Sequence, residues 1–130
     1  MFRIQRRDLR EFEVTSKTCV AGFTARRVAT PGREAAFRIA EGGLLFLKSE
    51  GNNDHKLVHF DFADSDIRID RLPEMPTLCD APTANTPRDN YEVFTRTFAE
   101  NYISFDLKQT DWDKVVADNQ ARVTSTTPPA

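Results

Sequence analysis

Serine is the first residue type to examine for chemistry, because an activated serine hydroxyl is a common nucleophile in hydrolases. The chain of 130 residues has five serines: Ser16, Ser49, Ser65, Ser104 and Ser125. None lies in a Gly-x-Ser-x-Gly sequence, which is typical of a nucleophile at a strand-to-helix turn. Ser16 precedes Lys17, and Lys48 precedes Ser49. Neighbouring residues of a strand point to opposite faces and cannot share a proton, so we expect no catalytic residue in this chain.

Histidine and aspartate are the candidates for metal ligands. His55 and His59 are four residues apart, but the residues between them include no glutamate base, and the segment is typical of a strand. In a strand this spacing separates the two rings by roughly 13 Å. We therefore expect histidines on one strand surface, with no metal site and no cofactor.

A cluster of carboxylates follows the histidines: Asp61, Asp64, Asp66 and Asp70. A calcium loop needs oxygen ligands on a tight turn, usually with a glycine and a final glutamate. Residues 63–66 have neither, so a solvated turn is the prediction.

Cys19 and Cys79 are the two cysteines, and sixty residues separate them. They have no Cys-x-x-Cys spacing, so they are either two separate buried thiols or one disulfide that joins the first hairpin to a later segment. In the chain-entropy model, a disulfide closing so long a loop stabilises the fold by roughly 4 kcal/mol. As a candidate disulfide, the pair should have Cα atoms about 4.4–6.8 Å apart.

Composition and charge narrow the class of protein. Apolar residues make up 39% and charged residues 29%, which is typical of a soluble, folded domain. Residues 1–40 hold nine Lys/Arg and four Asp/Glu, whereas residues 41–130 hold nine and sixteen. The basic part has no aromatic-basic or zinc-finger motif, so we expect no nucleic-acid partner. No apolar run approaches 18 residues, and no signal peptide is visible, so we expect no membrane span.

The first 72 residues predict an antiparallel β-meander. Apolar and polar residues alternate over five or six short segments, including residues 12–15, 37–39, 44–47, 58–62 and 67–70. Gly42-Gly43 and Gly51-Asn52 are the clearest hairpin turns. We expect these strands to close into a small barrel or sandwich.

The remaining residues predict an α+β fold with a two-helix hairpin at its end. Residues 73–87 form a proline-rich connector, and residues 88–130 form a helical segment. Thr86 and Pro87 are typical of a helix start, and either Thr110 or Asp111 should cap a second helix. Two stripes should pack against each other: Tyr91, Phe94, Phe98 and Tyr102 on the first helix, and Trp112, Val115, Val116 and Asn119 on the second.

An ordered series of short phrases in this region resembles a known family. Thr86-Pro87-Arg88-Asp89-Asn90-Tyr91-Glu92-Val93-Phe94 is followed by Phe98-Ala99-Glu100-Asn101-Tyr102, then Phe105, Thr110-Asp111-Trp112 and Arg122-Val123-Thr124. The series resembles the N-terminal helical segment of tail-specific, tricorn-core type serine peptidases (the C-terminal-processing peptidases). Upstream, residues 12–19 and 69–79 are similar to the β-rich leader of secreted bacterial members, including both cysteines.

The resemblance implies that the catalytic residues of this family lie beyond Ala130, because none of them maps onto this chain. It implies a structural and substrate-screening role for the chain, with a downstream catalytic domain and a polypeptide substrate as partners. It also implies an extracytoplasmic location for the parent protein, and self-association of the isolated chain if the helices lack their partner. The alternatives are a stand-alone β-barrel binding module with appended helices and the product of a truncated peptidase gene.

Overall fold

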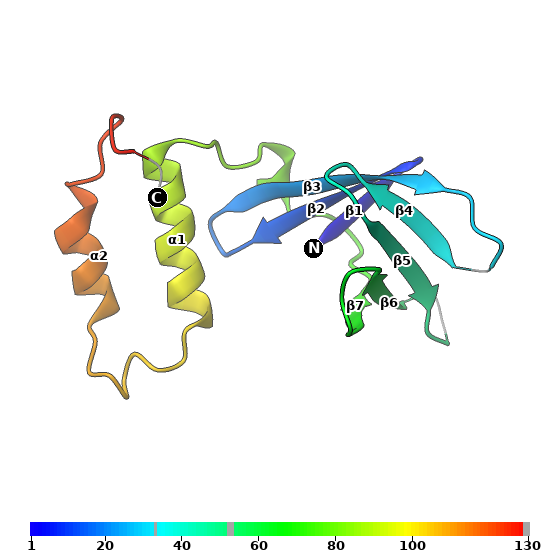
Figure 1. Ribbon diagram of the computed structural model, residues 1–130. Coiled ribbons are helices and arrows are strands. Elements are labelled where there is room, and N and C mark those ends of the chain that lie inside the picture. Colours follow the sequence, from blue (N-terminus) through cyan, green and yellow to red (C-terminus); the bar gives the residue numbers. More distant parts are fainter. Residues whose placement is uncertain (33, 52–53, 129–130) are drawn as a thin grey trace. The chain divides into compact units, whose positions relative to one another are not determined.

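The computed structural model describes residues 1–32, 34–51 and 54–128. Within these residues, seven strands precede two helices. Their order is β1 (Phe2–Gln5), β2 (Asp8–Val14), β3 (Cys19–Val28), β4 (Ala35–Ile39), β5 (Leu44–Ser49), β6 (His55–Phe60), β7 (Ile67–Asp70), the 3-10 turn η1 (Thr77–Asp80), α1 (Pro87–Asn101) and α2 (Trp112–Gln120). The predicted α+β fold with an N-terminal meander is confirmed (Figure 1).

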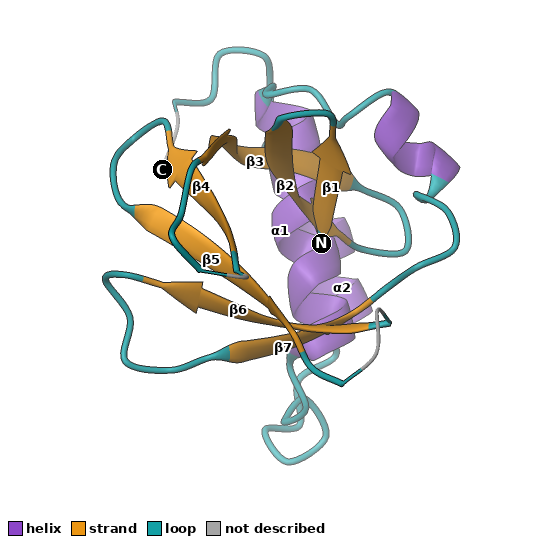
Figure 2. Cartoon of the chain, turned by 90° about the vertical axis from the view of Figure 1, so that its right-hand side faces the viewer, coloured by secondary structure: helices purple, strands orange, loops and turns teal. Residues whose placement is uncertain are grey.

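The strands form one antiparallel sheet in which each strand pairs with its neighbours in the chain, in the order β1 to β7. The sheet curls into a half-barrel, with β1 and β7 as its two edge strands (Figure 2). The number of strands differs from the predicted five or six, because the longest strand, β3, has no clear alternation. The side that carries Ala25 also carries the large Phe23 and the charged Arg27, and Val20 and Val28 lie on the other side.

The chain divides into two compact units, residues 1–12 with 21–76 and residues 13–20 with 77–130. The first unit has its core inside the curl of the sheet. Phe37, Leu9, Leu45 and Val58 are the largest of its fully buried side chains, and each stabilises the fold by about 1.5–3 kcal/mol through removal from water. Phe2, Phe23 and Phe60 pack against this core from its margin.

Turn residues explain how β4 and β5 pair. Gly42 and Gly43 have φ angles of +121° and +87°, which only glycine adopts without strain. A Cβ atom on Gly43 would lie 2.9 Å from the ring of Phe62. The predicted Gly42-Gly43 hairpin turn is therefore confirmed. Of the other predicted turn, Asn52 and Asn53 lie outside the described residues. The predicted strand over 58–62 is too long, since β6 ends at Phe60 and the side chain of Phe62 is exposed.

The second unit contains the tip of the β2–β3 hairpin, η1 and both helices. Thr86 caps α1 by accepting a hydrogen bond from the backbone N–H of Asp89, and Pro87 opens the helix, as predicted. Asp111, rather than Thr110, caps α2 by accepting from the N–H of Lys114. In the proline-rich segment before α1, η1 forms a single short turn.

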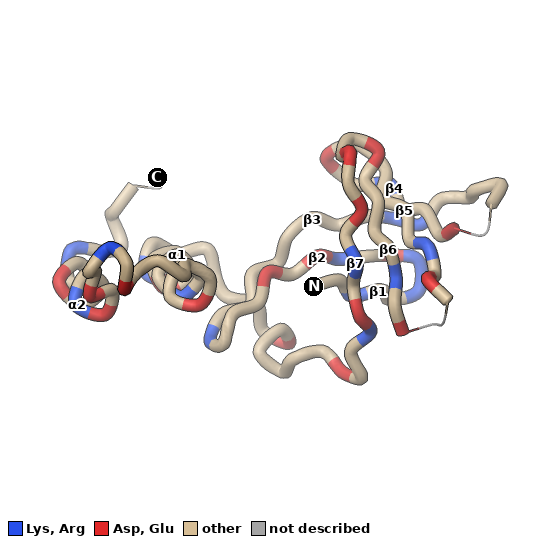
Figure 3. Tube along the Cα trace, turned by 90° about the horizontal axis from the view of Figure 1, so that it is seen from below, with Lys and Arg blue, Asp and Glu red and all other residues tan. Residues whose placement is uncertain are grey.

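Charged residues of both signs are interspersed along the strands and the helices (Figure 3). Among the described residues, no helix is both long and apolar enough to cross a membrane.

Candidate functional site

Aromatic side chains gather where α1, the following loop and the start of α2 meet. Trp112 is their centre, and its ring stacks on Phe105 with centroids 5.1 Å apart and on Phe98 at 5.5 Å. Phe94 meets the same indole edge-on at 6.2 Å, and Tyr102 meets Phe105 at 4.8 Å. We call Phe94, Phe98, Tyr102, Phe105 and Trp112 the aromatic cluster. Offset or edge-to-face pairs of this kind stabilise by about 0.5–1.5 kcal/mol each beyond their burial.

Two hydrogen bonds fix the helices beneath this cluster. The indole Nε1 of Trp112 donates to the carbonyl oxygen of Thr95 at 3.1 Å, and the hydroxyl of Tyr91 donates to the carbonyl of Val116 at 3.0 Å. Thr95 is buried between these contacts. The two stripes therefore meet, as the sequence predicts, along Tyr91, Thr95 and Trp112.

Much of the aromatic cluster nevertheless remains exposed. Phe94 keeps 50% of its surface exposed, Phe98 40% and Tyr102 41%. Ile103 and Leu107, in the loop beside the cluster, are 97% and 80% exposed. Large apolar side chains that lie side by side at a surface are typical of an interaction site. The prediction that each stripe buries the other is thus only partly correct, because the hairpin alone does not cover both.

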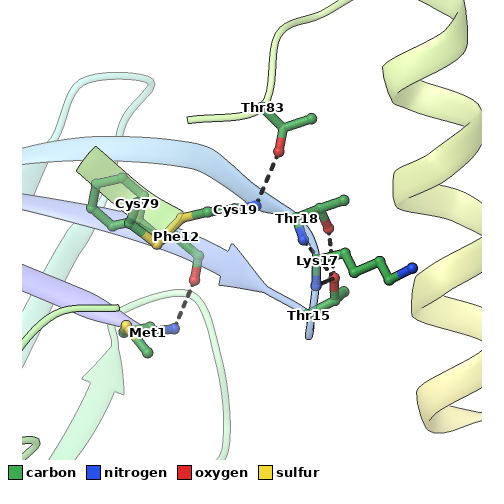
Figure 4. Close-up of a disulfide and its surroundings, with 8 residues drawn as sticks. All are labelled: Met1, Phe12, Thr15, Lys17, Thr18, Cys19, Cys79 and Thr83. Atoms are coloured by element: carbon green, nitrogen blue, oxygen red, sulfur yellow. Dashed lines mark hydrogen bonds between the residues drawn. A yellow bond between two sulfur atoms is a disulfide. The ribbon is translucent and has the colours of Figure 1, made fainter. Parts of the chain in front are cut away.

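Cys19 and Cys79 form a disulfide in the second unit, with Cα atoms 5.3 Å apart, within the range expected from the sequence (Figure 4). Two hydrogen bonds accompany it: the N–H of Cys19 donates to the hydroxyl of Thr83 at 3.0 Å, and the N–H of Thr83 donates to the carbonyl of Cys19 at 2.8 Å. Both sulfur-bearing residues are buried. The disulfide therefore joins the β2–β3 tip to the segment that leads into α1.

A carboxylate of α1 holds the same hairpin tip. Glu100 accepts from the backbone N–H of Ser16 with both of its oxygens, at 3.1 Å each, and also from the Ser16 hydroxyl. These hydrogen bonds to the charged form lower the pKa of Glu100, and the nearby Arg96 lowers it further. The hydroxyl of Ser16 thus donates to a carboxylate that lies in open solvent. The sequence does not indicate this contact, because 84 residues separate its partners.

One serine meets a lysine across two strands. The Lys56 ammonium donates to the hydroxyl of Ser49 at 2.7 Å, an exposed contact between paired residues of β5 and β6. The sequence does not indicate this contact, because seven residues separate Ser49 from Lys56. This hydrogen bond links the two strands at their surface.

Each histidine of β6 pairs with an aspartate of the predicted turn or of β7. His55 Nδ1 lies 2.6 Å from the Asp70 carboxylate, and His59 Nδ1 lies 2.8 Å from that of Asp66. The cluster that sequence analysis interpreted as a solvated turn is thus partly engaged in cross-strand pairs. Within residues 1–32, 34–51 and 54–128, no three His, Cys, Asp or Glu side chains are placed to hold a metal ion.

The first unit has a separate feature, a groove of about 620 Å³ lined mainly by apolar side chains of β1, β7 and the segment after β7.

Comparisons of the chain with family models, curated proteins and solved structures found no match. The aromatic cluster, the disulfide and this groove are the features of the described residues that bear on function.

Proposed function

We propose that this chain is the non-catalytic N-terminal part of a serine endopeptidase, where it packs against a catalytic domain and screens polypeptide substrates. The observation that carries the proposal is the half-exposed aromatic cluster, which lies within the sequence phrases that resemble the tail-specific peptidases. A face that the hairpin itself leaves uncovered is a face that another domain can cover.

The energetics of the aromatic cluster support a docking role. Aromatic residues dominate the binding energy of protein interfaces when they lie in well-packed, desolvated positions. Here Trp112 already orders Phe98 and Phe105 by stacking, so little side-chain entropy remains to be lost on docking. A preorganised aromatic surface of this kind binds at a lower entropic cost than a flexible one.

The disulfide supports the proposed extracytoplasmic location of the parent protein. Disulfides persist in secreted and periplasmic proteins, whereas cytosolic thiols are kept reduced. The Cys19–Cys79 bond also holds the hairpin tip against the segment that enters α1, so it preserves the second unit in such a compartment.

An alternative is a stand-alone β-barrel binding module with appended helices, which acts without a catalytic domain. The groove of the first unit favours this alternative, because concave apolar sites with a few polar groups are the usual binding sites of small domains.

The coding sequence downstream of codon 130 distinguishes the peptidase proposal from the binding module. An open frame that encodes a further helix, an Asp-Gly-His phrase and a later nucleophilic serine supports the peptidase proposal. A stop codon at that position would refute it and leave the binding module or the product of a truncated peptidase gene. Expression of the longer frame, with fluorophosphonate labelling of its serine, then tests activity directly.

A further inference from the structure

Hydrogen-bonding groups of β1 point away from the sheet. The backbone groups of Met1 and Phe12 exchange two hydrogen bonds, at 2.8 and 2.7 Å, so this is a hydrogen-bonded pair of the β1–β2 ladder. Hydrogen-bonded and non-hydrogen-bonded pairs alternate along antiparallel strands. Arg3 and Arg10 are therefore the next hydrogen-bonded pair. The N–H and C=O groups of Phe2 and Ile4 therefore face outward, at the free edge of the sheet.

The other edge strand, β7, also has backbone N–H and C=O groups that face away from the sheet. The N–H of Arg71 donates to the carbonyl of Asp54 at 2.7 Å, which places the hydrogen-bonded pairs of the β6–β7 ladder at Arg71, Ile69 and Ile67. The N–H and C=O groups of Arg68 and Asp70 consequently face outward. In the part of the chain that the structure describes, no backbone hydrogen bond satisfies these groups.

The two free edges line one groove. Its apolar wall includes Phe2 and Ile4 of β1, Leu47 of β5, Ile69 of β7, and Leu72 and Met75 of the following segment. Ile4 and Leu72 keep 52% and 51% of their surfaces exposed. The groove therefore combines unpaired strand edges with uncovered apolar side chains, which are the two requirements for the addition of a strand.

The direction of the strands also suits a single added strand. In a meander of seven antiparallel strands, β1 and β7 run in the same direction. One extended segment can then pair with both of them in the antiparallel sense. It would complete an eight-stranded sheet, the size at which side chains fill the interior of a small barrel.

The charges of the groove indicate the chemistry of the partner. Arg3 and Arg71 line it, and neither has a carboxylate partner among the described residues. Asp70 is already paired with His55. Glu74 is the remaining acidic group of the lining, so the unpaired side chains carry a net positive charge. Acidic groups on the partner would complement them.

We propose that the groove between β1 and β7 binds an extended segment of another polypeptide as an eighth strand, antiparallel to both edges. The segment has apolar residues at alternate positions, which face the core, and carboxylates near Arg3 and Arg71. This inference goes beyond the proposed function and does not depend on it, because the groove belongs entirely to the first unit.

The probe is a fluorescein-labelled peptide of about eight residues that alternates valine and threonine and has a glutamate at each end. Its matched control has the same side chains but N-methylated amides, which cannot donate to a strand edge. Fluorescence anisotropy should show saturable binding of the first peptide and none of the second. Equal binding of both peptides, or no binding of the first up to about 1 mM, would overturn the proposal.

A pair of protein variants tests the edge itself. Arg68→Pro removes one outward N–H of β7 and leaves the β6–β7 ladder intact, since edge strands tolerate proline where the N–H faces solvent. Arg68→Ala removes the same side chain and keeps the N–H. We expect the proline variant to bind the peptide about five-fold more weakly than the alanine variant, which should bind within about two-fold of the unmodified chain.

Equal affinities of these two variants, with both folded by circular dichroism, would overturn the proposal. If the proline variant does not fold, the N-methylated peptide decides alone. A concentration-dependent dimer that persists in a Phe94→Gln variant, and that the acidic peptide fails to dissociate, would also count against it, because the occupant of the groove would then be a second copy of this chain.

Discussion

The indole Nε1 of Trp112 donates its hydrogen bond to the main-chain carbonyl of Thr95, a residue in the middle of α1. A side chain at the first position of one helix is thereby tied to the backbone of the other. The bond orients the indole so that Phe98 and Phe105 stack on it. Trp112 thus contacts three of the other four rings of the aromatic cluster: Phe94, Phe98 and Phe105.

Replacement of Trp112 should accordingly destabilise the second unit. We expect Trp112→Ala to lower the free energy of unfolding by about 3 kcal/mol, at the low end for a buried tryptophan because this indole is only half-buried. The measurement is thermal or urea unfolding followed by the helical circular dichroism signal. Ile103→Ala is the matched control, since Ile103 is 97% exposed, and it should change stability by less than about 0.5 kcal/mol. A Trp112→Ala variant as stable as the unmodified chain would show that the helix packing is wrong.

The disulfide should contribute strongly to stability. Cys19→Ser with Cys79→Ser should lower the free energy of unfolding by about 4 kcal/mol, the chain-entropy value for a loop of this length. Unfolding of the oxidised chain with and without reductant gives the same comparison without mutation. Thiol titration serves as the control for complete reduction. An unchanged transition in fully reduced protein would contradict the prediction.

The contact between Ser16 and Glu100 should make stability depend on pH. The folded-state pKa of Glu100 lies below its ordinary value, so the contact stabilises the fold above that ordinary value. The stabilisation is lost as the pH falls through the lowered folded-state pKa. We expect the difference in unfolding midpoint between the unmodified chain and Glu100→Gln to be constant near neutral pH and to shrink in acid.

The range to scan is about pH 3–6, where glutamate carboxylates titrate. Asp113→Asn replaces an exposed carboxylate in the first turn of α2. It is the control for acid destabilisation that does not involve Glu100. A difference for Glu100→Gln that stays constant down to the lowest pH would mean that the contact with Ser16 does not stabilise the fold.

The aromatic cluster should make the isolated chain associate. We expect concentration-dependent oligomers by light scattering, together with binding of a hydrophobic dye. Phe94→Gln should reduce both signals, because Phe94 is the most exposed ring of the cluster. Phe62→Gln is the matched control, since Phe62 is 69% exposed in the other unit, and it should leave association unchanged. A monomeric chain that binds no dye would favour the self-sufficient binding module.

Helix starts and hairpin turns could be predicted from the sequence. Thr86 and Pro87 mark the start of α1, and Gly42-Gly43 mark the turn between β4 and β5, because caps and turns depend on residues only a few positions apart. The sequence does not predict the strand at residues 19–28, because apolar residues lie on both of its sides, with Val20 and Val28 opposite Phe23 and Ala25. Pairing with β2 and β4 holds it extended despite this weak pattern.

The sites were harder to predict because they depend on register and curvature. The pairs of His55 with Asp70 and His59 with Asp66 follow from the antiparallel register of β6 and β7, which the sequence does not give. The groove exists because the sheet curls until β1 and β7 line one cavity. Of the two readings of Cys19 and Cys79 that the sequence left open, the structure has the disulfide.

Fluorophosphonate labelling tests the central claim, that this chain is the non-catalytic part of a serine peptidase. The chain of residues 1–130 is incubated with the probe in parallel with the protein encoded by the full reading frame, and labelled sites are located by mass spectrometry. The account predicts label on one serine beyond residue 130 and none on the five serines of this chain. Label on a serine within residues 1–130, abolished when that serine is replaced by alanine, would contradict it.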